Sequence, residues 1–215
     1  MYKNILITGG SSKISFYLKK FIPKKYRVFA PSSKDWDFSN LDFNQAQINL
    51  IKKCDRIFLF HSNLSNKKNL LKNEKEIHKQ LNINLLSKIK ICEISLKYNH
   101  KTRIFIIGSE SGQKGSFDIV YALSKSSINK YVEERKILHK KQQLICIAPS
   151  TIVDGKMTIR RKDQKNVKKS IRNNPKQRGL YSKEISKLIY DLSFGNTDYV
   201  TNTVINVNGG KFSRM

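Results

Sequence analysis

Tyr121 and Lys125 stand four positions apart in a segment with helical spacing, and together they can carry acid–base chemistry. Side chains at i and i+4 lie on one face of a helix, which places the phenol beside the ammonium group. A neighbouring ammonium stabilises a phenolate and so makes a tyrosine a useful general acid or base near neutral pH. In isolation, this spacing is more often that of a core tyrosine beside a solvated lysine, so other residues must support it.

Ser109 and Asn84 extend this pair into a candidate catalytic group. Ser109 ends a short apolar run upstream of Tyr121, and Asn84 lies within the preceding helical segment. The carboxyl ends of strands meet at one edge of an open parallel sheet, where α/β proteins bind their ligands. We therefore expect these polar side chains to converge at one end of a sheet.

A glycine-containing turn follows the first apolar run, and from Thr8 to Ser15 it reads TGGSSKIS. Small residues let the backbone approach a pyrophosphate, and the N-terminus of the next helix offers free N–H groups and a positive dipole end. Lys13 and Ser15 stand where a dinucleotide-binding fingerprint has its second and third glycines. Lys13 could meet a phosphate or crowd it, and an ordinary strand-to-helix turn is the alternative interpretation.

Short apolar runs alternate with helical segments along the whole chain of 215 residues. The runs cover residues 4–8, 27–30, 56–60, 103–107, 144–148 and 204–207, and the helical segments cover 12–21, 42–53, 74–97, 121–139 and 183–194. This order predicts a single α/β domain over residues 1–215, a doubly wound parallel sheet of Rossmann type. The polar and basic stretch 154–179 breaks the pattern and predicts a loop or lid on the substrate side.

The composition narrows the class of protein. Forty-two Lys and Arg against 16 Asp and Glu give a net charge of +26, but the basic residues are scattered over nearly every helical segment. A general bias toward Lys and Asn explains this at least as well as nucleic-acid binding, which we do not expect. No apolar stretch approaches the roughly 20 residues of a membrane span, and we expect a cytoplasmic protein. Cys54, Cys92 and Cys146 lack metal-type spacing, so we expect buried, reduced thiols and no metal site.

Taken together, the motifs resemble the short-chain dehydrogenase/reductase family from about residue 3 to residue 211. The resemblance rests on the glycine turn, Asn84, Ser109 followed by Gly112, the Tyr121 and Lys125 pair, Ala148-Pro149-Ser150 and Val207-Asn208-Gly209-Gly210. It implies that Tyr121 protonates a carbonyl oxygen while a hydride arrives from a nicotinamide. Lys125 would assist Tyr121 and hold the nicotinamide ribose, Ser109 would bond the substrate oxygen, and Asn84 would hold a water that relays protons.

The same resemblance implies where a dinucleotide would bind. The cofactor-binding candidates are Thr8, Gly9, Ser11, Ser12, Lys13, Ile14, Ser32, Ser33, Lys34, Asp37, Phe60, His61, Ser62, Tyr121, Lys125, Pro149, Ser150 and Ile152. After the second run, hydroxyls and a cation precede the first acid, Asp35, which favours NADP over NAD. Asp37 would contact the adenine or cap a turn, and His61 would lie on the adenosine side or be a hydrogen-bonded structural residue.

Substrate and assembly are predicted from charge and from helix faces. Ten basic residues in the lid favour an anionic substrate, such as a nucleotide-linked or acidic sugar or a carrier-bound acyl group. A solvated basic flap would have the same composition. The ten residues are Lys156, Arg160, Arg161, Lys162, Lys165, Lys168, Lys169, Arg172, Lys176 and Arg178. Extra apolar positions on segments 74–97 and 121–139 predict a homodimer or homotetramer. The altered glycine turn leaves one alternative, a non-catalytic binding or scaffold protein of the same fold.

Overall fold

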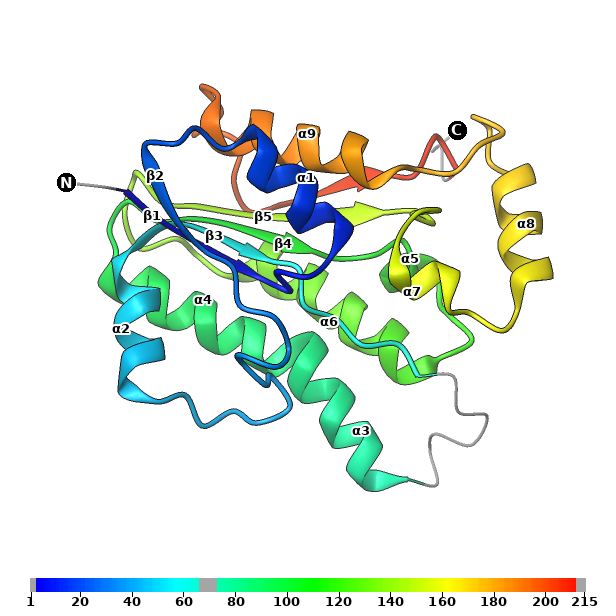
Figure 1. Cartoon of the computed structure of the whole chain (residues 1–215), viewed down its shortest axis with the longest axis horizontal. Helices are drawn as coiled ribbons and strands as arrows, with labels where there is room; N and C mark the ends of the chain where they lie inside the picture. The colour runs from blue at the N-terminus through cyan, green and yellow to red at the C-terminus, as the bar shows by residue number, and fades with distance from the viewer. Residues whose placement is uncertain (1–2, 66–72, 212–215) are drawn as a thin grey trace.

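The computed structural model describes residues 3–65 and 73–211, which form one six-stranded parallel sheet flanked by helices (Figure 1). The strands are β1 (Lys3–Thr8), β2 (Tyr26–Phe29), β3 (Cys54–Leu59), β4 (Arg103–Ile107), β5 (Gln143–Pro149) and β6 (Thr203–Val207). Their order across the sheet is β2-β1-β3-β4-β5-β6, and each neighbouring pair is parallel. The order reverses between β1 and β3, which is where open α/β sheets bind ligands.

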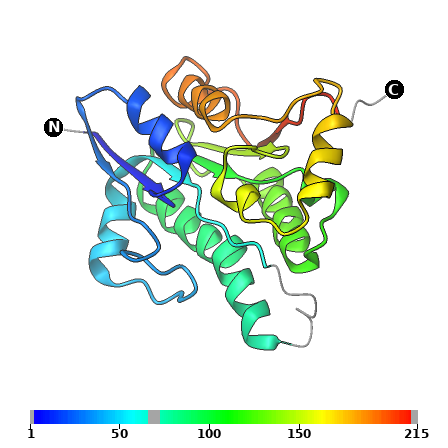
Figure 2. The same cartoon turned by 45° about the vertical axis from the view of Figure 1, so that its right-hand side comes forward.

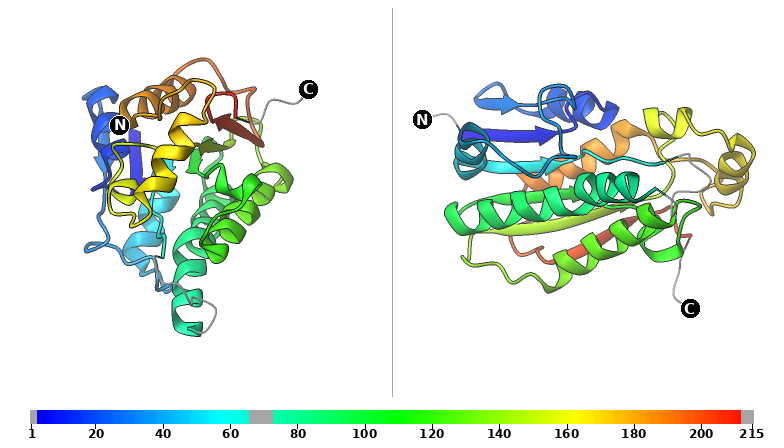
Figure 3. Two further views of the ribbon diagram at one scale, coloured as in Figure 1. Left: turned by 90° about the vertical axis from the view of Figure 1, so that its right-hand side faces the viewer. Right: turned by 90° about the horizontal axis from the view of Figure 1, so that it is seen from below.

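Helices cover both faces of the sheet, as the views in Figures 1, 2 and 3 show. One face carries α1 (Lys13–Phe21) and α9 (Ser182–Phe194), and the other carries α2 (Gln45–Lys53), α4 (Ser87–Tyr98) and α6 (Ile119–Glu134). Two separate apolar clusters fill the two interfaces. Strand β4 supplies both: Ile104 and Ile106 face one cluster, and Phe105 and Ile107 face the other. Continuous apolar strands are thus explained by burial on both faces.

The predicted doubly wound α/β fold is confirmed, and all six predicted strands are present. Helix boundaries differ at several points. The segment 42–53 becomes helical only at Gln45, because Asn44 and Gln47 form a capping box. The helix that begins at residue 119 ends at Glu134 rather than near residue 139, since the Gln142 side chain accepts bonds from Leu138 N and His139 N in a turn.

The segment 74–97 is three pieces rather than the one regular helix predicted. It comprises α3 (Glu74–Leu81), a π-helical turn at Asn82–Leu86 and α4. A π-turn inserts an extra residue into the helical ladder and so rotates the side chains that follow, and such turns often lie at functional sites. Asn84 lies in the middle of this turn and is completely buried.

The stretch 154–179 contains two short helices, α7 (Lys156–Ile159) and α8 (Gln164–Arg172). Figure 1 shows both beyond the carboxyl ends of the strands, together with α5 (Ser111–Lys114). Lys211 holds α8 in place, because its ammonium donates to Ser170 Oγ at 2.9 Å and lies 3.3 Å from a carboxylate oxygen of Glu110. The predicted basic excursion is therefore a structured cover over one end of the sheet.

The three cysteines are free and buried, as predicted from their apolar surroundings. Burial raises the pKa of Cys54 to about 12 and that of Cys146 to about 11, which keeps both as inert thiols at neutral pH. In the two described ranges, every helix is too short or too polar to span a bilayer.

Candidate active site

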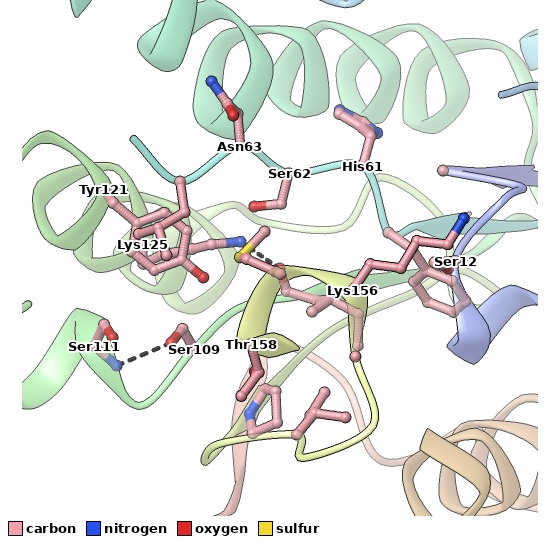
Figure 4. Close-up of a pocket in the computed structure, with 18 of the residues that line it drawn as sticks. Ser12, His61, Ser62, Asn63, Ser109, Ser111, Tyr121, Lys125, Lys156 and Thr158 are labelled. Atoms are coloured by element: carbon pink, nitrogen blue, oxygen red, sulfur yellow. Dashed lines mark hydrogen bonds between the residues drawn. The ribbon is translucent and has the colours of Figure 1, made fainter. Parts of the chain in front are cut away.

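A cleft of about 1090 Å³ opens at the carboxyl ends of the strands and is the place where the predicted site residues gather. Its walls come from the turn after β1, the loops after β2 and β3, the start of α6, and α7 of the lid. Figure 4 shows Ser12 at the opposite side of the cleft from Tyr121 and Ser109, with His61, Ser62 and Asn63 on the loop along it.

The turn after β1 has room only for glycine at two positions. Gly9 has a φ of +69°, and a Cβ there would lie 2.9 Å from the backbone nitrogen of His61. At Gly10 a Cβ would come within 2.0 Å of the carbonyl oxygen of Ala30. The two glycines therefore let the turn pack directly against the ends of β2 and β3.

Ser12 caps α1, since its side chain accepts a bond from Ser15 N at 3.1 Å. The N–H groups of Lys13 and Ile14 belong to the first helical turn, where the helix itself provides no acceptor. These donors, the helix dipole and the close backbone approach fit a pyrophosphate. The turn therefore has the features expected of a pyrophosphate site, and the binding of a dinucleotide there stays a prediction.

The two departures from the fingerprint, Ser15 and Lys13, have different surroundings. Ser15 is buried and its hydroxyl donates to Gly9 O at 2.8 Å, so it stabilises the turn from behind. Lys13 lines the cleft with about half of its side chain exposed, and its ammonium lies 3.7 Å from Asp154 Oδ2. That carboxylate also accepts bonds from Ser182 N and Oγ at the start of α9.

Tyr121, Lys125 and Ser109 all line one end of the cleft (Figure 4). Tyr121 is only 9% exposed, and the Lys125 ammonium lies 5.4 Å from the centre of its ring. Lys125 is fully buried and donates to Ile107 O, at the end of β4, at 2.9 Å. Ser109 Oγ accepts a bond from Ser111 N at 3.0 Å, which orients it at the start of α5. The structure thus brings together three of the four predicted catalytic residues.

Asn84, the fourth, is buried behind the cleft and does not line it. Its Oδ1 accepts from Ser62 Oγ and Asn63 N, and its Nδ2 donates to Asn63 O, all at 2.8 Å. The side chain therefore holds the loop after β3 by both ends of its amide. The proton relay through a water that we expected at Asn84 stays a prediction.

Most of the predicted cofactor-binding residues border the cleft. Those that do are Gly9, Ser11, Ser12, Lys13, Ile14, Ser33, Asp37, Phe60, His61, Ser62, Tyr121, Lys125, Pro149, Ser150 and Ile152. Thr8 lies beneath it, where its hydroxyl oxygen accepts from Phe60 N. Ser32 and Lys34 are also outside the lining; Ser32 N and Oγ donate to Asp35 at 2.8 and 2.7 Å, and these bonds lower the pKa of that carboxyl.

His61 borders the cleft and is held in place by three side chains. Its ring stacks on Phe38 at 3.9 Å, Nδ1 lies 2.6 Å from Thr8 Oγ1, and Nε2 lies 3.0 Å from Ser87 Oγ. Burial is the main cause that lowers its pKa well below the ordinary value, so the imidazole is neutral at neutral pH. These bonds match the structural alternative given above for this histidine.

Asp118 is a site residue that sequence reasoning missed. It is 4% exposed and caps α6, accepting bonds from Tyr121 N at 3.0 Å, Ser65 N at 2.8 Å and Gln80 Nε2 at 2.6 Å. It thereby joins the first turn of the tyrosine helix to the loop after β3 and to α3. An aspartate three residues before a helical tyrosine is an N-cap signal that could have identified it.

No protein-family model matches the chain, and no curated protein matches it in sequence. Several solved structures match it in fold. A short chain dehydrogenase family protein from Francisella tularensis is 21% identical, with a TM-score of 0.81 over 98% of this chain and 99% of that one. A 3-ketoacyl-(acyl-carrier-protein) reductase from Brucella melitensis, complexed with NADH, is 14% identical, with a TM-score of 0.80 over 97% and 98%.

A tyrosine-to-phenylalanine variant of ElxO with NADPH bound is 20% identical to this chain, with a TM-score of 0.81 and complete coverage of both chains. The protein therefore has the fold of the short-chain dehydrogenases/reductases, which confirms the fold that its motifs predicted.

We predict that Asp118→Ala lowers the free energy of unfolding by about 1–3 kcal/mol, because three donors around it lose their acceptor while they stay buried. Urea unfolding measures the change. Asp198→Ala is the matched control, since Asp198 is exposed. Equal stability of the two variants would contradict the role assigned to Asp118.

Proposed function

We propose that this protein is an NAD(P)-dependent oxidoreductase that interconverts a carbonyl group and a secondary alcohol and prefers NADPH. The observation that supports it best is the single cleft that runs from the glycine turn and the N-terminus of α1 to Tyr121, Lys125 and Ser109. A pyrophosphate site and an acid–base pair at the two ends of one cleft suit a dinucleotide that reacts with a second molecule.

In this proposal the dinucleotide supplies or accepts the hydride. Tyr121 gives its phenolic proton to the substrate oxygen in reduction and takes it back in oxidation. Ser109 Oγ already accepts the Ser111 N–H, so its own O–H is available to the same substrate oxygen. Lys125 places its positive charge beside the phenol while Ile107 O holds the ammonium in position. The low exposure of Tyr121 limits competing water.

The proposed preference for NADPH rests on the loop after β2. An acid that grips the ribose 2′-hydroxyl would favour NADH. Here the nearest acid, Asp35, already accepts two bonds from Ser32, while Ser33 borders the cleft and Lys34 is exposed beside it. A hydroxyl and a cation suit the 2′-phosphate of NADPH.

The proposed substrate is an anionic small molecule, such as a nucleotide-linked or acidic sugar or a carrier-bound acyl group. Of the ten basic lid residues, all of them in the described part of the chain, three line the cleft: Lys156, Arg160 and Arg161. Arg161 is engaged in two bonds to Asp163 at 2.8 and 2.6 Å. Lys156 and Arg160 have no carboxylate partner among residues 3–65 and 73–211, so they are the cations we assign to the substrate.

Titration of the protein with NADPH and with NADH, followed by nucleotide fluorescence, tests the proposal. We expect saturable binding of NADPH, with weaker binding of NADH, because the turn offers N–H groups to the pyrophosphate of both and the β2 loop favours the 2′-phosphate. No binding of either at millimolar concentration would refute the oxidoreductase and favour the non-catalytic binding or scaffold protein.

Tyr121→Phe separates binding from chemistry. We expect it to leave NADPH binding nearly unchanged and to lower the rate of NADPH oxidation with a panel of anionic carbonyl compounds by about 10²–10⁴-fold, the loss typical of a general acid. Lys125→Ala should impair both binding and rate. Tyr131→Phe is the matched control on the same helix, since its hydroxyl bonds Glu93 rather than the cleft. A Tyr121→Phe variant as active as Tyr131→Phe would refute the mechanism.

We also propose that the protein forms a homodimer, or a homotetramer, through the face that α4 and α6 turn away from the sheet. Leu86 and Leu123 are 41% and 58% exposed there. The charge of +26 per chain opposes association, and salt weakens this repulsion. We expect sedimentation to show a dimer or larger at 0.15 M salt, where the screening length is about 8 Å. A monomer at that salt and tens of micromolar protein would contradict it.

The three free, buried thiols suit the cytoplasmic location that we propose.

A further inference from the structure

A second lysine, Lys88, is completely buried behind the candidate active site and is not explained by the proposed mechanism. It lies on α4, one turn after Asn84, and its ammonium group lies 3.4 Å from Ile107 O. The same carbonyl oxygen accepts the bond from Lys125 at 2.9 Å. Two lysines from two helices therefore meet at one acceptor at the end of β4.

The groups that face Lys88 cannot balance a second positive charge. They are Lys125 on α6, His61 on the loop after β3, Cys146 on β5 and Cys92 on α4 itself. Among residues 3–65 and 73–211, neither lysine has a carboxylate partner. Two unpaired ammonium groups in a dry interior are strongly unfavourable, because each loses its hydration and repels the other.

Both lysines are fully buried, but they differ in their position relative to the cleft. Lys125 borders the cleft, whereas Lys88 does not line it. Burial first, and then the charge of Lys125, lowers the pKa of Lys88 well below that of an ordinary lysine. The lone pair of Lys88 is therefore free to accept a hydrogen bond.

We propose that Lys88 is held as a neutral amine behind Lys125, and that its lone pair accepts a hydrogen bond from the Lys125 ammonium, which keeps that charge beside Tyr121. The neutral amine is independent of the proposed function, whereas its use in catalysis rests on it.

The two lysine nitrogens lie at one acceptor, Ile107 O, at 3.4 and 2.9 Å, which brings an N–H of Lys125 toward the lone pair of Lys88. No bond is broken and no proton changes residue: Lys125 stays an ammonium and Lys88 stays an amine. Lys88 is a positioning residue, since it acts on Tyr121 only through Lys125.

Nuclear magnetic resonance of protein labelled with ¹³C at the lysine side chains tests the neutral amine without substrate or dinucleotide. We expect one lysine signal that titrates at much lower pH than the others and is lost in Lys88→Met. In Lys125→Met its midpoint should move to higher pH, because the repelling charge is gone. Lys97→Met, an exposed position on the same helix, is the matched control and should leave the midpoint unchanged. A Lys88 signal that titrates like the exposed lysines overturns the proposal.

The ultraviolet absorbance of tyrosinate tests the positioning role. The difference between wild type and Tyr121→Phe isolates the ionisation of Tyr121. We expect this ionisation to move to higher pH in Lys88→Met, where the amine that holds the Lys125 ammonium beside the phenol is absent, and to stay in place in Lys97→Met. An unchanged ionisation in Lys88→Met overturns the positioning role. Neither experiment uses NADPH, so a protein that binds no dinucleotide but passes both tests refutes only the proposed function.

Stability against pH gives a second readout should Lys125→Met fail to fold. The folded state lowers the pKa of Lys88, so the unfolded chain binds a proton there that the folded chain does not. The resulting destabilisation is small above the unfolded pKa of about 10.4 and grows as the pH falls toward the folded pKa. Lys88→Met removes it, so its gain in stability over wild type should be larger at pH 7 than at pH 10. A gain that does not depend on pH contradicts the neutral amine.

Discussion

The carbonyl oxygen of Ile107 is the point on which the geometry of the site depends. It stands at the end of β4 and receives Lys125 from α6 and Lys88 from α4. These two bonds attach both helices to the sheet at the depth where the cleft begins. Tyr121, one helical turn before Lys125, is thereby placed at the cleft wall. A strand end that accepts two buried lysines also holds the Lys125 side chain near the phenol of Tyr121.

The loop after β3 completes this wall, and two buried side chains fix the conformation of the loop. Asn84 binds Ser62 and Asn63 through both ends of its amide, and Asp118 accepts the backbone N–H of Ser65. Each of them belongs to a helix that also contributes to the site: Asn84 to the π-turn before α4, and Asp118 to the start of α6. The loop and the tyrosine helix are therefore positioned by shared contacts.

The net charge of +26 does not describe the environment of the cleft. Glu110, nearly fully buried, pairs with Lys114 at 2.7 Å and with Lys211 at 3.3 Å. Asp154 meets Lys13, and Asp163 meets Arg161. Most basic lid residues lie away from the cleft. These three acids thus engage cations around the site, which leaves Lys156 and Arg160, within the described part of the lid, as the cleft-lining cations without a carboxylate partner.

The sequence by itself determined the order of elements and the identity of the candidate acid–base pair. Alternating apolar runs and helical segments predict a parallel sheet because burial on both faces requires continuous apolar strands, and the spacing of Tyr121 and Lys125 is a local property of a helix. Only the tertiary structure decided the surroundings of that pair. The contacts of Lys88, Asn84 and Asp118 join residues roughly 20 to 50 positions apart, and a π-turn changes which way Asn84 points. Such contacts depend on how helices pack against the strand ends, which periodicity in the sequence does not encode.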